Sequence, residues 1–253
     1  YLEYRAWLKE FHGTKIKYAI IDYDLLFPKA LSLALDSVGV KTFAFQERAT
    51  SSLYYKINGT ICDFYAYSGA LWRQIGEKNS SIICDKALNL GAWRLCFFYS
   101  NFLESKMRFH KKVPYVESKK RILFLGYFLE NSSPATNLNA NNQLFEYVIE
   151  VAKFFANDLI FIRMKVLDNK TFDLALSRLS NIHNVYISTD YDTPALSYGL
   201  CRDADAIVCP QTSLAEEALA YGKKVVLLDN LYSVKGLCSA IYPFQFYFMI
   251  AQG

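Results

Sequence analysis

The stretch that decides the fold is Asp203-Ala-Asp-Ala-Ile-Val-Cys-Pro-Gln-Thr-Ser-Leu-Ala-Glu-Glu-Ala-Leu-Ala-Tyr-Gly-Lys-Lys-Val-Val-Leu-Leu-Asp229. Its first apolar run, residues 204–209, predicts a buried strand. The helical spacing over 214–221, ended by Gly222, predicts a helix, and residues 224–228 predict a second strand. A strand, a helix and a strand joined by short turns are typical of parallel α/β architecture.

The turn that leads into this helix carries hydroxyl groups. Thr212 and Ser213 stand where the helix begins, and a hydroxyl there accepts a hydrogen bond from an otherwise unpaired backbone amide. The remaining amides and the helix dipole favour a phosphate at this end. One turn further, Glu216 or Glu217 is placed to reach a sugar hydroxyl beside that phosphate. The purely structural alternative is a capping box, because Ser213 and Glu216 have the S-x-x-E spacing.

Strands and helices alternate along the rest of the chain in the same way. In the N-terminal half we expect strands over 17–22, 41–46, 61–67 and 81–84, and helices over 28–38 and 68–76. In the C-terminal half we expect strands over 121–126, 159–163 and 184–188, and helices over 143–156, 171–179 and 193–201.

A polar segment without periodicity, residues 109–120, predicts a linker between two domains. We therefore expect an N-terminal acceptor-side domain over 1–115 and a C-terminal donor-binding domain over 116–253. Because the chain opens at Tyr1 inside a helical pattern, we expect the first domain to be truncated. The predicted class is α/β, with two Rossmann-like parallel-sheet domains facing a central cleft, where ligands of such folds bind.

The composition limits the class of protein further. Of the 253 residues, 53% are hydrophobic and 21% charged, with a formal net charge of +4, which excludes a disordered chain. Basic residues are interleaved with acidic ones, so we expect no nucleic-acid partner, whereas a small anionic ligand fits. The six cysteines form no CxxC pair, which favours a reduced, cytoplasmic location. No apolar stretch reaches the about 20 residues of a membrane span.

The stretch from 184 to 230 resembles the donor-binding half of GT-B fold glycosyltransferases and of the related UDP-N-acetylglucosamine 2-epimerases. In those families a strand, turn and helix place Ser, Thr or Gly residues on the nucleotide phosphate. A Glu five residues before a helix-ending Gly holds the ribose. The resemblance therefore implies that Thr212 and Ser213 bind the phosphate and that Glu217, five residues before Gly222, binds the ribose.

Two other segments resemble bacterial capsule and Kdo (3-deoxy-manno-octulosonic acid) transferases. Ile160-Phe-Ile-Arg-Met-Lys165 looks like their strand that ends in basic residues. Arg163 and Lys165 share a strand face, so they would pair with a phosphate or sugar carboxylate, the alternative being ordinary surface charges. Phe27-Pro-Lys-Ala-Leu-Ser-Leu-Ala-Leu, followed by residues 39–46, is similar to their acceptor domain. Relatives commonly have Pro-His and His-Gly where this chain has Val166-Leu167 and Glu47-Arg48.

Glycosyl transfer needs a general base or a carboxylate nucleophile. Asp22, Asp24 and Glu47 follow predicted strands of the N-terminal half and are the catalytic candidates, the alternative for each being a loop or capping role. The three histidines lack metal-ligand spacing. Asp203-Ala-Asp205 has the D-x-D spacing of metal-dependent transferases, but it is interpreted as a helix–strand junction. We expect no metal and no cofactor, because the nucleotide sugar is a substrate.

These features together predict a glycosyltransferase. It would move a sugar from a CMP-Kdo-like or UDP-sugar donor to a bacterial surface glycan or glycolipid. The alternatives are a sugar-nucleotide 2-epimerase, a CDP-glycerol-type phosphotransferase and a non-catalytic sugar-nucleotide-binding module. A 2-epimerase should supply several acidic and His groups, and the chain has three His. The aromatic tail over 242–250 allows peripheral contact with the inner face of the membrane, or else forms a final helix that packs back across the domains.

Overall fold

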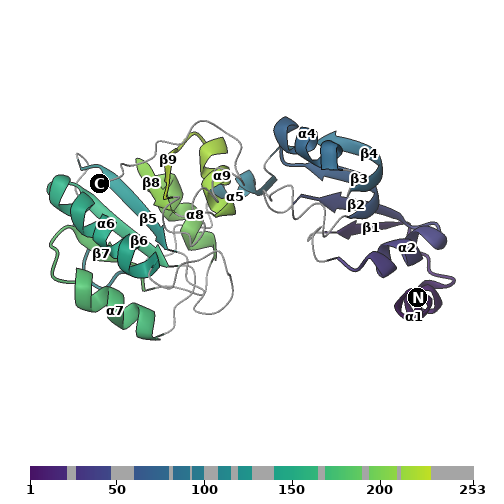
Figure 1. Cartoon of the computed structure of the whole chain (residues 1–253), viewed down its shortest axis with the longest axis horizontal. Coiled ribbons are helices and arrows are strands. Elements are labelled where there is room, and N and C mark those ends of the chain that lie inside the picture. Colours follow the sequence, from purple (N-terminus) through teal and green to yellow (C-terminus); the bar gives the residue numbers. More distant parts are fainter. Residues whose placement is uncertain are drawn as a thin grey trace. The chain divides into compact units, whose positions relative to one another are not determined.

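The protein forms two compact units, Tyr1–Trp93 and Arg94–Gly253, and each contains a parallel sheet (Figure 1). The computed structural model describes residues 1–21, 27–46, 60–79, 82–91, 93–99, 108–114, 119–126, 140–164, 169–189, 194–209 and 212–228. The predicted α/β class with two parallel-sheet domains is confirmed. Within these ranges, no helix is both long enough and apolar enough to cross a membrane.

The chain divides into these two units between Trp93 and Arg94, earlier than the expected limit at residue 115. The short helix α5 (Cys96–Tyr99) explains this position. Its buried Phe98 packs against Tyr198 at 5.1 Å between ring centroids and stacks on Tyr221 at 4.7 Å, and both partners belong to the second unit. A linker predicted from polarity alone could not reveal these contacts.

The described strands of the first unit form a four-stranded sheet in the order β1-β2-β3-β4, with every neighbouring pair parallel. Its elements are α1 (Leu2–Phe11), β1 (Tyr18–Ile21), α2 (Lys29–Ser37), β2 (Lys41–Phe45), β3 (Ile61–Tyr67), α4 (Ala70–Asn79) and β4 (Ile83–Asn89). They confirm the strands and helices expected here. The last strand extends well beyond the predicted residue 84.

The two faces of this first sheet differ in burial. Helix α2 packs against β2 and β3, over the face that carries the buried Thr42 and Ala44. The opposite face carries Tyr18 and Ile20, which are 66% and 71% exposed. The described part of the first unit therefore buries one face of its sheet more completely than the other.

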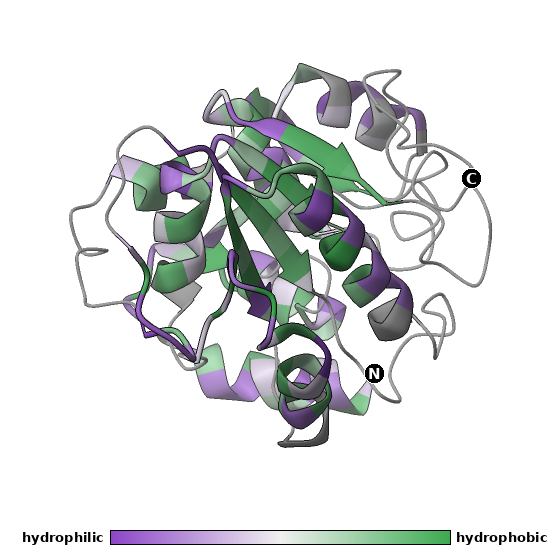
Figure 2. Cartoon of the chain, turned by 90° about the vertical axis from the view of Figure 1, so that its left-hand side faces the viewer, coloured by the Kyte–Doolittle hydropathy of each residue, from purple (hydrophilic) through white to green (hydrophobic). Residues whose placement is uncertain are grey.

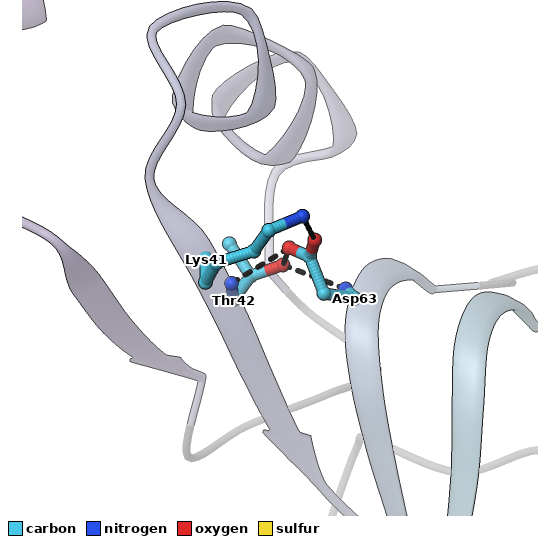
Figure 3. Close-up of polar contacts among 3 residues, drawn as sticks. All are labelled: Lys41, Thr42 and Asp63. Carbon is cyan, nitrogen blue, oxygen red and sulfur yellow. Dashed lines mark hydrogen bonds and ion pairs between the residues drawn. The ribbon is translucent and has the colours of Figure 1, made fainter.

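A buried carboxylate joins the first residues of β2 to β3, and we call Lys41, Thr42 and Asp63 the Asp63 cluster (Figure 3). The Asp63 carboxylate, 6% exposed, accepts hydrogen bonds from the Thr42 amide at 2.8 Å and the Thr42 hydroxyl at 2.9 Å, and it pairs with Lys41. Burial alone would raise the pKa of Asp63, but the hydrogen bonds from Lys41 and Thr42 outweigh it and lower the pKa. The cluster lies near the amino ends of the strands and links β2 to β3.

In the second unit, the strands that the structure describes form a five-stranded parallel sheet in the order β7-β6-β5-β8-β9. Its elements after α5 are β5 (Arg121–Gly126), α6 (Ala140–Phe154), β6 (Leu159–Met164), α7 (Asn169–Leu179), β7 (Val185–Ile187), α8 (Pro194–Asp203), β8 (Ala206–Cys209), α9 (Ser213–Ala220) and β9 (Lys224–Leu227). Every strand and helix predicted between residues 121 and 228 is confirmed, with ends shifted by a few residues, and the aromatic tail over 242–250 lies outside the described residues.

The core of the second unit lies between its sheet and its helices. All residues of β6 and β7 are buried, and so is every residue of β5 after the first, as expected for strands covered on both faces. Figure 2 shows these strands coloured mainly as hydrophobic, whereas the helices carry both hydrophobic and hydrophilic residues. Helix α6 contacts α7, and α8 contacts both α5 and α9.

Candidate functional site

The strand order of the second sheet reverses between β5 and β8. From β5 the chain adds β6 and then β7 on one side, and it then returns to add β8 and β9 on the other. In open parallel α/β sheets, ligands bind beyond the carboxyl ends of the strands at such a reversal. In this unit that place follows Gly126 of β5 and Cys209 of β8, immediately before α9 begins.

Helix α9 begins with Thr212 as its N-cap. Thr212 has extended backbone angles, and its hydroxyl accepts a hydrogen bond from the Leu214 amide at 3.4 Å. Ser213 is the first helical residue, so the alternative interpretation of a capping box with Ser213 as its cap is wrong. The helix ends at Ala220, and Gly222 follows with a φ of +88°, as its predicted role as a stop requires. The amide end of α9 therefore lies at the reversal of the sheet.

Ser213 and Glu217 lie on one face of α9, because residues four apart stack along a helix. The Glu217 side chain is 8% exposed, and its carboxylate interacts with Tyr198 and Arg94. The Tyr198 hydroxyl donates to Oε2 at 2.5 Å, and Arg94 Nη1 lies 3.8 Å from Oε1. We call Arg94, Tyr198 and Glu217 the Glu217 cluster.

Aromatic rings hold Tyr198 of the Glu217 cluster in place. Phe97 and Phe98 from α5 each lie 5.1 Å from the Tyr198 ring centroid. Burial raises the pKa of Tyr198, and the negative charge of Glu217 raises it further, so the hydroxyl stays protonated and remains a donor. Sequence reasoning missed both Arg94 and Tyr198. Their only signal was the aromatic density around α5, which does not identify a partner.

Arg163 lies at the carboxyl end of β6, opposite Leu125 of β5. Its Nε donates to the Ser197 hydroxyl of α8 and its Nη1 to the Ser188 hydroxyl after β7, each at 3.2 Å. Arg163 is only 4% exposed, so its interpretation as an ordinary surface charge is wrong. Its strand is two positions from β8, or about 10 Å at the usual strand spacing. Arg163 and the start of α9 therefore lie on opposite sides of the reversal, and they would contact different parts of a bound ligand.

The other predicted site residues, Asp22, Asp24, Glu47 and Lys165, lie outside the described residues and remain predictions. β1 ends at Ile21, directly before Asp22.

The helix–strand junction predicted at Asp203-Ala-Asp205 is confirmed. Helix α8 ends at Asp203 and β8 begins at Ala206, and the Asp205 carboxylate accepts the Arg121 amide at 2.7 Å. Among the residues placed by the structure, no three or more His, Cys, Asp or Glu side chains gather closely enough to hold a metal ion.

Solved structures that share this fold include the following three. S. aureus MnaA with UDP matches 94% of this chain and 63% of its own, at a TM-score of 0.61 and 12% identity. UDP-GlcNAc 2-epimerase from Neisseria meningitidis bound to UDP-GlcNAc matches 94% of this chain and 66% of its own, at a TM-score of 0.59 and 15% identity. MurG from Acinetobacter baumannii matches 95% of this chain and 60% of its own, at a TM-score of 0.52 and 10% identity.

The chain spans less than two thirds of the length of each of these structures. No family model matches the sequence, and no curated protein matches it. The resemblance to Kdo transferases in particular stays a prediction. At these identities the similarity shows the fold alone, which is a GT-B-type fold of two Rossmann-like domains.

Proposed function

We propose that this chain is a sugar-nucleotide enzyme that binds a UDP-sugar at the carboxyl ends of its second sheet. One observation carries the proposal: the amide end of α9 lies at the reversal of the sheet, with Ser213 and Glu217 on one helix face. Backbone amides and the positive end of the helix dipole favour an anion there. The ligands named in two of the structures with this fold, UDP and UDP-GlcNAc, carry such an anion.

The spacing along α9 suits a nucleotide diphosphate. Thr212 and Ser213 stand at the first turn, where a phosphate would accept hydrogen bonds from amides and hydroxyls. Glu217 lies four residues beyond Ser213, about 6 Å along the axis, which is comparable to the separation of a phosphate from the ribose hydroxyls attached to it. Arg163, on the other side of the reversal, would offset negative charge on the rest of the ligand.

We favour 2-epimerisation of the sugar as the reaction, because a UDP-GlcNAc 2-epimerase is among the structures with this fold. Inverting a carbon that carries hydrogen requires groups that remove and return a proton. Asp22, Asp24 and Glu47 remain the candidates for these groups. The donor site would hold the UDP portion while the sugar reacts.

Glycosyl transfer is the second candidate. MurG, named as the third similar structure, and the resemblance of residues 160–165 to capsule and Kdo transferases favour it. In this reaction the same site would stabilise the departing UDP or CMP, and the acceptor would be a bacterial surface glycan or glycolipid. That reaction would take place in the cytoplasm or at the inner face of the membrane.

Calorimetric titration with UDP, CMP, CDP and inorganic pyrophosphate tests the binding site. We expect UDP to bind more tightly than pyrophosphate, because the ribose adds contacts to Glu217. Equal affinity for both ligands, or no binding of either, would contradict the proposal. Tighter binding of CMP than of UDP would favour a Kdo-type donor instead, and tighter binding of CDP would favour the CDP-glycerol-type phosphotransferase.

Proton NMR of UDP-GlcNAc incubated with the full chain then separates the reactions. A new anomeric signal from the C2 epimer, without release of UDP, identifies the 2-epimerase. UDP release that depends on an added glycan acceptor identifies the transferase. Tight binding with neither product would identify a non-catalytic sugar-nucleotide-binding module and would contradict an enzymatic role.

A further inference from the structure

We infer that Arg94 and Tyr198 are positioning residues that fix the Glu217 carboxylate for the ribose hydroxyls of the nucleotide. This inference rests on the proposed function. It adds two residues from α8 and from the start of the second unit to the site formed by α9.

The two partners hold different oxygens of the same carboxylate. Tyr198 donates to Oε2 at 2.5 Å, and Arg94 Nη1 lies 3.8 Å from Oε1. Two contacts at two oxygens oppose rotation of the carboxylate plane, which a single contact would allow. The two hydroxyls of a ribose would donate to this same carboxylate, whose two oxygens accept about four hydrogen bonds in all.

Burial makes this arrangement effective. Glu217 is 6% exposed and Tyr198 is 9% exposed, so their hydrogen bond has little competition from water. A buried carboxylate without partners would be costly, and Arg94 supplies the compensating positive charge. A group held in this way loses little conformational freedom when a ligand binds, and that preorganisation raises affinity.

The anchors are themselves held by neighbours outside the Glu217 cluster. Phe98 packs edge-on against the Tyr198 ring, and the same Phe98 stacks on Tyr221 at the end of α9. Arg94 is the first residue of the second unit and is 23% exposed at its side chain. The position of Glu217 therefore depends on a segment that sequence analysis assigned to the other domain.

The test compares UDP with 2′,3′-dideoxy-UDP, which keeps the base and diphosphate but lacks both ribose hydroxyls. Titrations use the full chain, with Tyr198→Phe, Arg94→Met and Arg94→Lys, and with Glu217→Gln as the reference loss. Tyr221→Phe is the matched control, because Tyr221 also packs on Phe98. Thermal unfolding of every variant checks that it folds.

We expect Tyr198→Phe to weaken UDP binding about tenfold, the effect of losing one charged hydrogen bond. Binding of the dideoxy analogue should not change. Arg94→Met should show the same selective loss, Arg94→Lys should restore part of it by keeping the charge, and Tyr221→Phe should have no effect. A purely structural role would weaken both ligands alike.

Two results would overturn the inference while leaving the proposed function intact. The first is that Glu217→Gln removes the preference for UDP over the dideoxy analogue but Tyr198→Phe and Arg94→Met do not. The second is that Tyr221→Phe causes the same loss as Tyr198→Phe. Failure of the unaltered chain to bind UDP, or to prefer it over the analogue, would overturn the proposed function together with the inference.

Discussion

The two sheets are both parallel, yet only the second, among the described strands, reverses its order. The first sheet runs β1-β2-β3-β4 in one direction, whereas the second runs β7-β6-β5-β8-β9 and changes direction beside β5. Strand β6 is buried throughout and β5 is buried after its first residue, whereas β1 and β4 of the first sheet are largely exposed. This difference shows why the candidate site lies in the second unit: a reversal separates the loops that follow two neighbouring strands and leaves room for a ligand.

Among the described residues, each unit also holds a buried carboxylate with charged and polar partners, and the two carboxylates are placed differently. Asp63 is held near the amino ends of its strands by Lys41 and Thr42, away from the ends where ligands bind. Glu217 is held one turn into the helix that begins at the sheet reversal. The same chemical group therefore serves stability in the first unit and, in our proposal, recognition in the second.

The largest effect we expect comes from adding a negative charge at the start of α9. Ser213→Asp should weaken UDP binding about 100-fold, because the new carboxylate repels a phosphate a few ångströms away. Stability should stay equal or rise slightly, since an acidic residue in the first turn suits the helix dipole.

The matched control for this charge is Ala220→Asp. It adds the same charge about 10 Å away, at the exposed end of α9. Titration of both variants with UDP, together with their thermal unfolding, checks the prediction. Equal losses in the two variants would mean that the phosphate does not bind at the amide end.

A loss of stability without loss of binding is expected in the first unit. Asp63→Asn should lower the free energy of unfolding by about 2 kcal/mol, because it removes the charge partner of Lys41 and disturbs the bonds from Thr42. Urea unfolding followed by circular dichroism measures this change. UDP affinity should be unaltered, and a fall in affinity would break the distinction between the two carboxylates.

Gly76→Ala should have a smaller effect in the same unit. A Cβ at position 76 would lie 2.5 Å from Cε1 of the buried Tyr67 ring, so α4 or the ring must shift. The clash costs about 1–3 kcal/mol, and the better helix propensity of alanine offsets about 1. We expect a net loss near 1 kcal/mol in urea unfolding. An increase in stability would show that the helix moves away from β3 at little cost.

The smallest effect is a pH dependence carried by the Asp63 cluster. The pKa of Asp63 in the folded protein is lower than its ordinary value of 3.8, so the unfolded chain binds the proton more readily. The cluster's contribution is therefore complete above about pH 5 and is lost as the pH falls through the folded pKa. Stability measured between pH 5 and 2 should fall less steeply in Asp63→Asn than in the unaltered chain. Identical slopes would contradict this assignment.

Much of the local structure was predictable because periodicity reports burial directly. The runs 61–67 and 121–126 gave strands with the predicted limits, and Gly222 ended α9 as expected. The predicted strand over 81–84 was too short, since Asp85, Lys86 and Asn89 interrupt the apolar run although β4 continues through them. A strand at the edge of a sheet tolerates such polar side chains.

The candidate site was predictable only in part. The turn at Thr212 and Ser213 has a recognisable local pattern, so its place at a helix start followed from neighbouring residues. Arg94 and Tyr198 reach Glu217 through tertiary contacts between distant segments, and no spacing in the sequence encodes them. The order of the strands, which places α9 beside the reversal, likewise emerges only from the folded sheet.

Hydrogen–deuterium exchange with and without UDP tests the central claim most directly, because it reports on both units at once. Saturating UDP should slow amide exchange over residues 212–217, where the first turn of α9 would donate to the phosphate. Exchange over 41–45, the strand that contributes Lys41 and Thr42 to the Asp63 cluster, should not change. Unchanged exchange over 212–217 in a chain that binds UDP would place the nucleotide elsewhere and contradict the account.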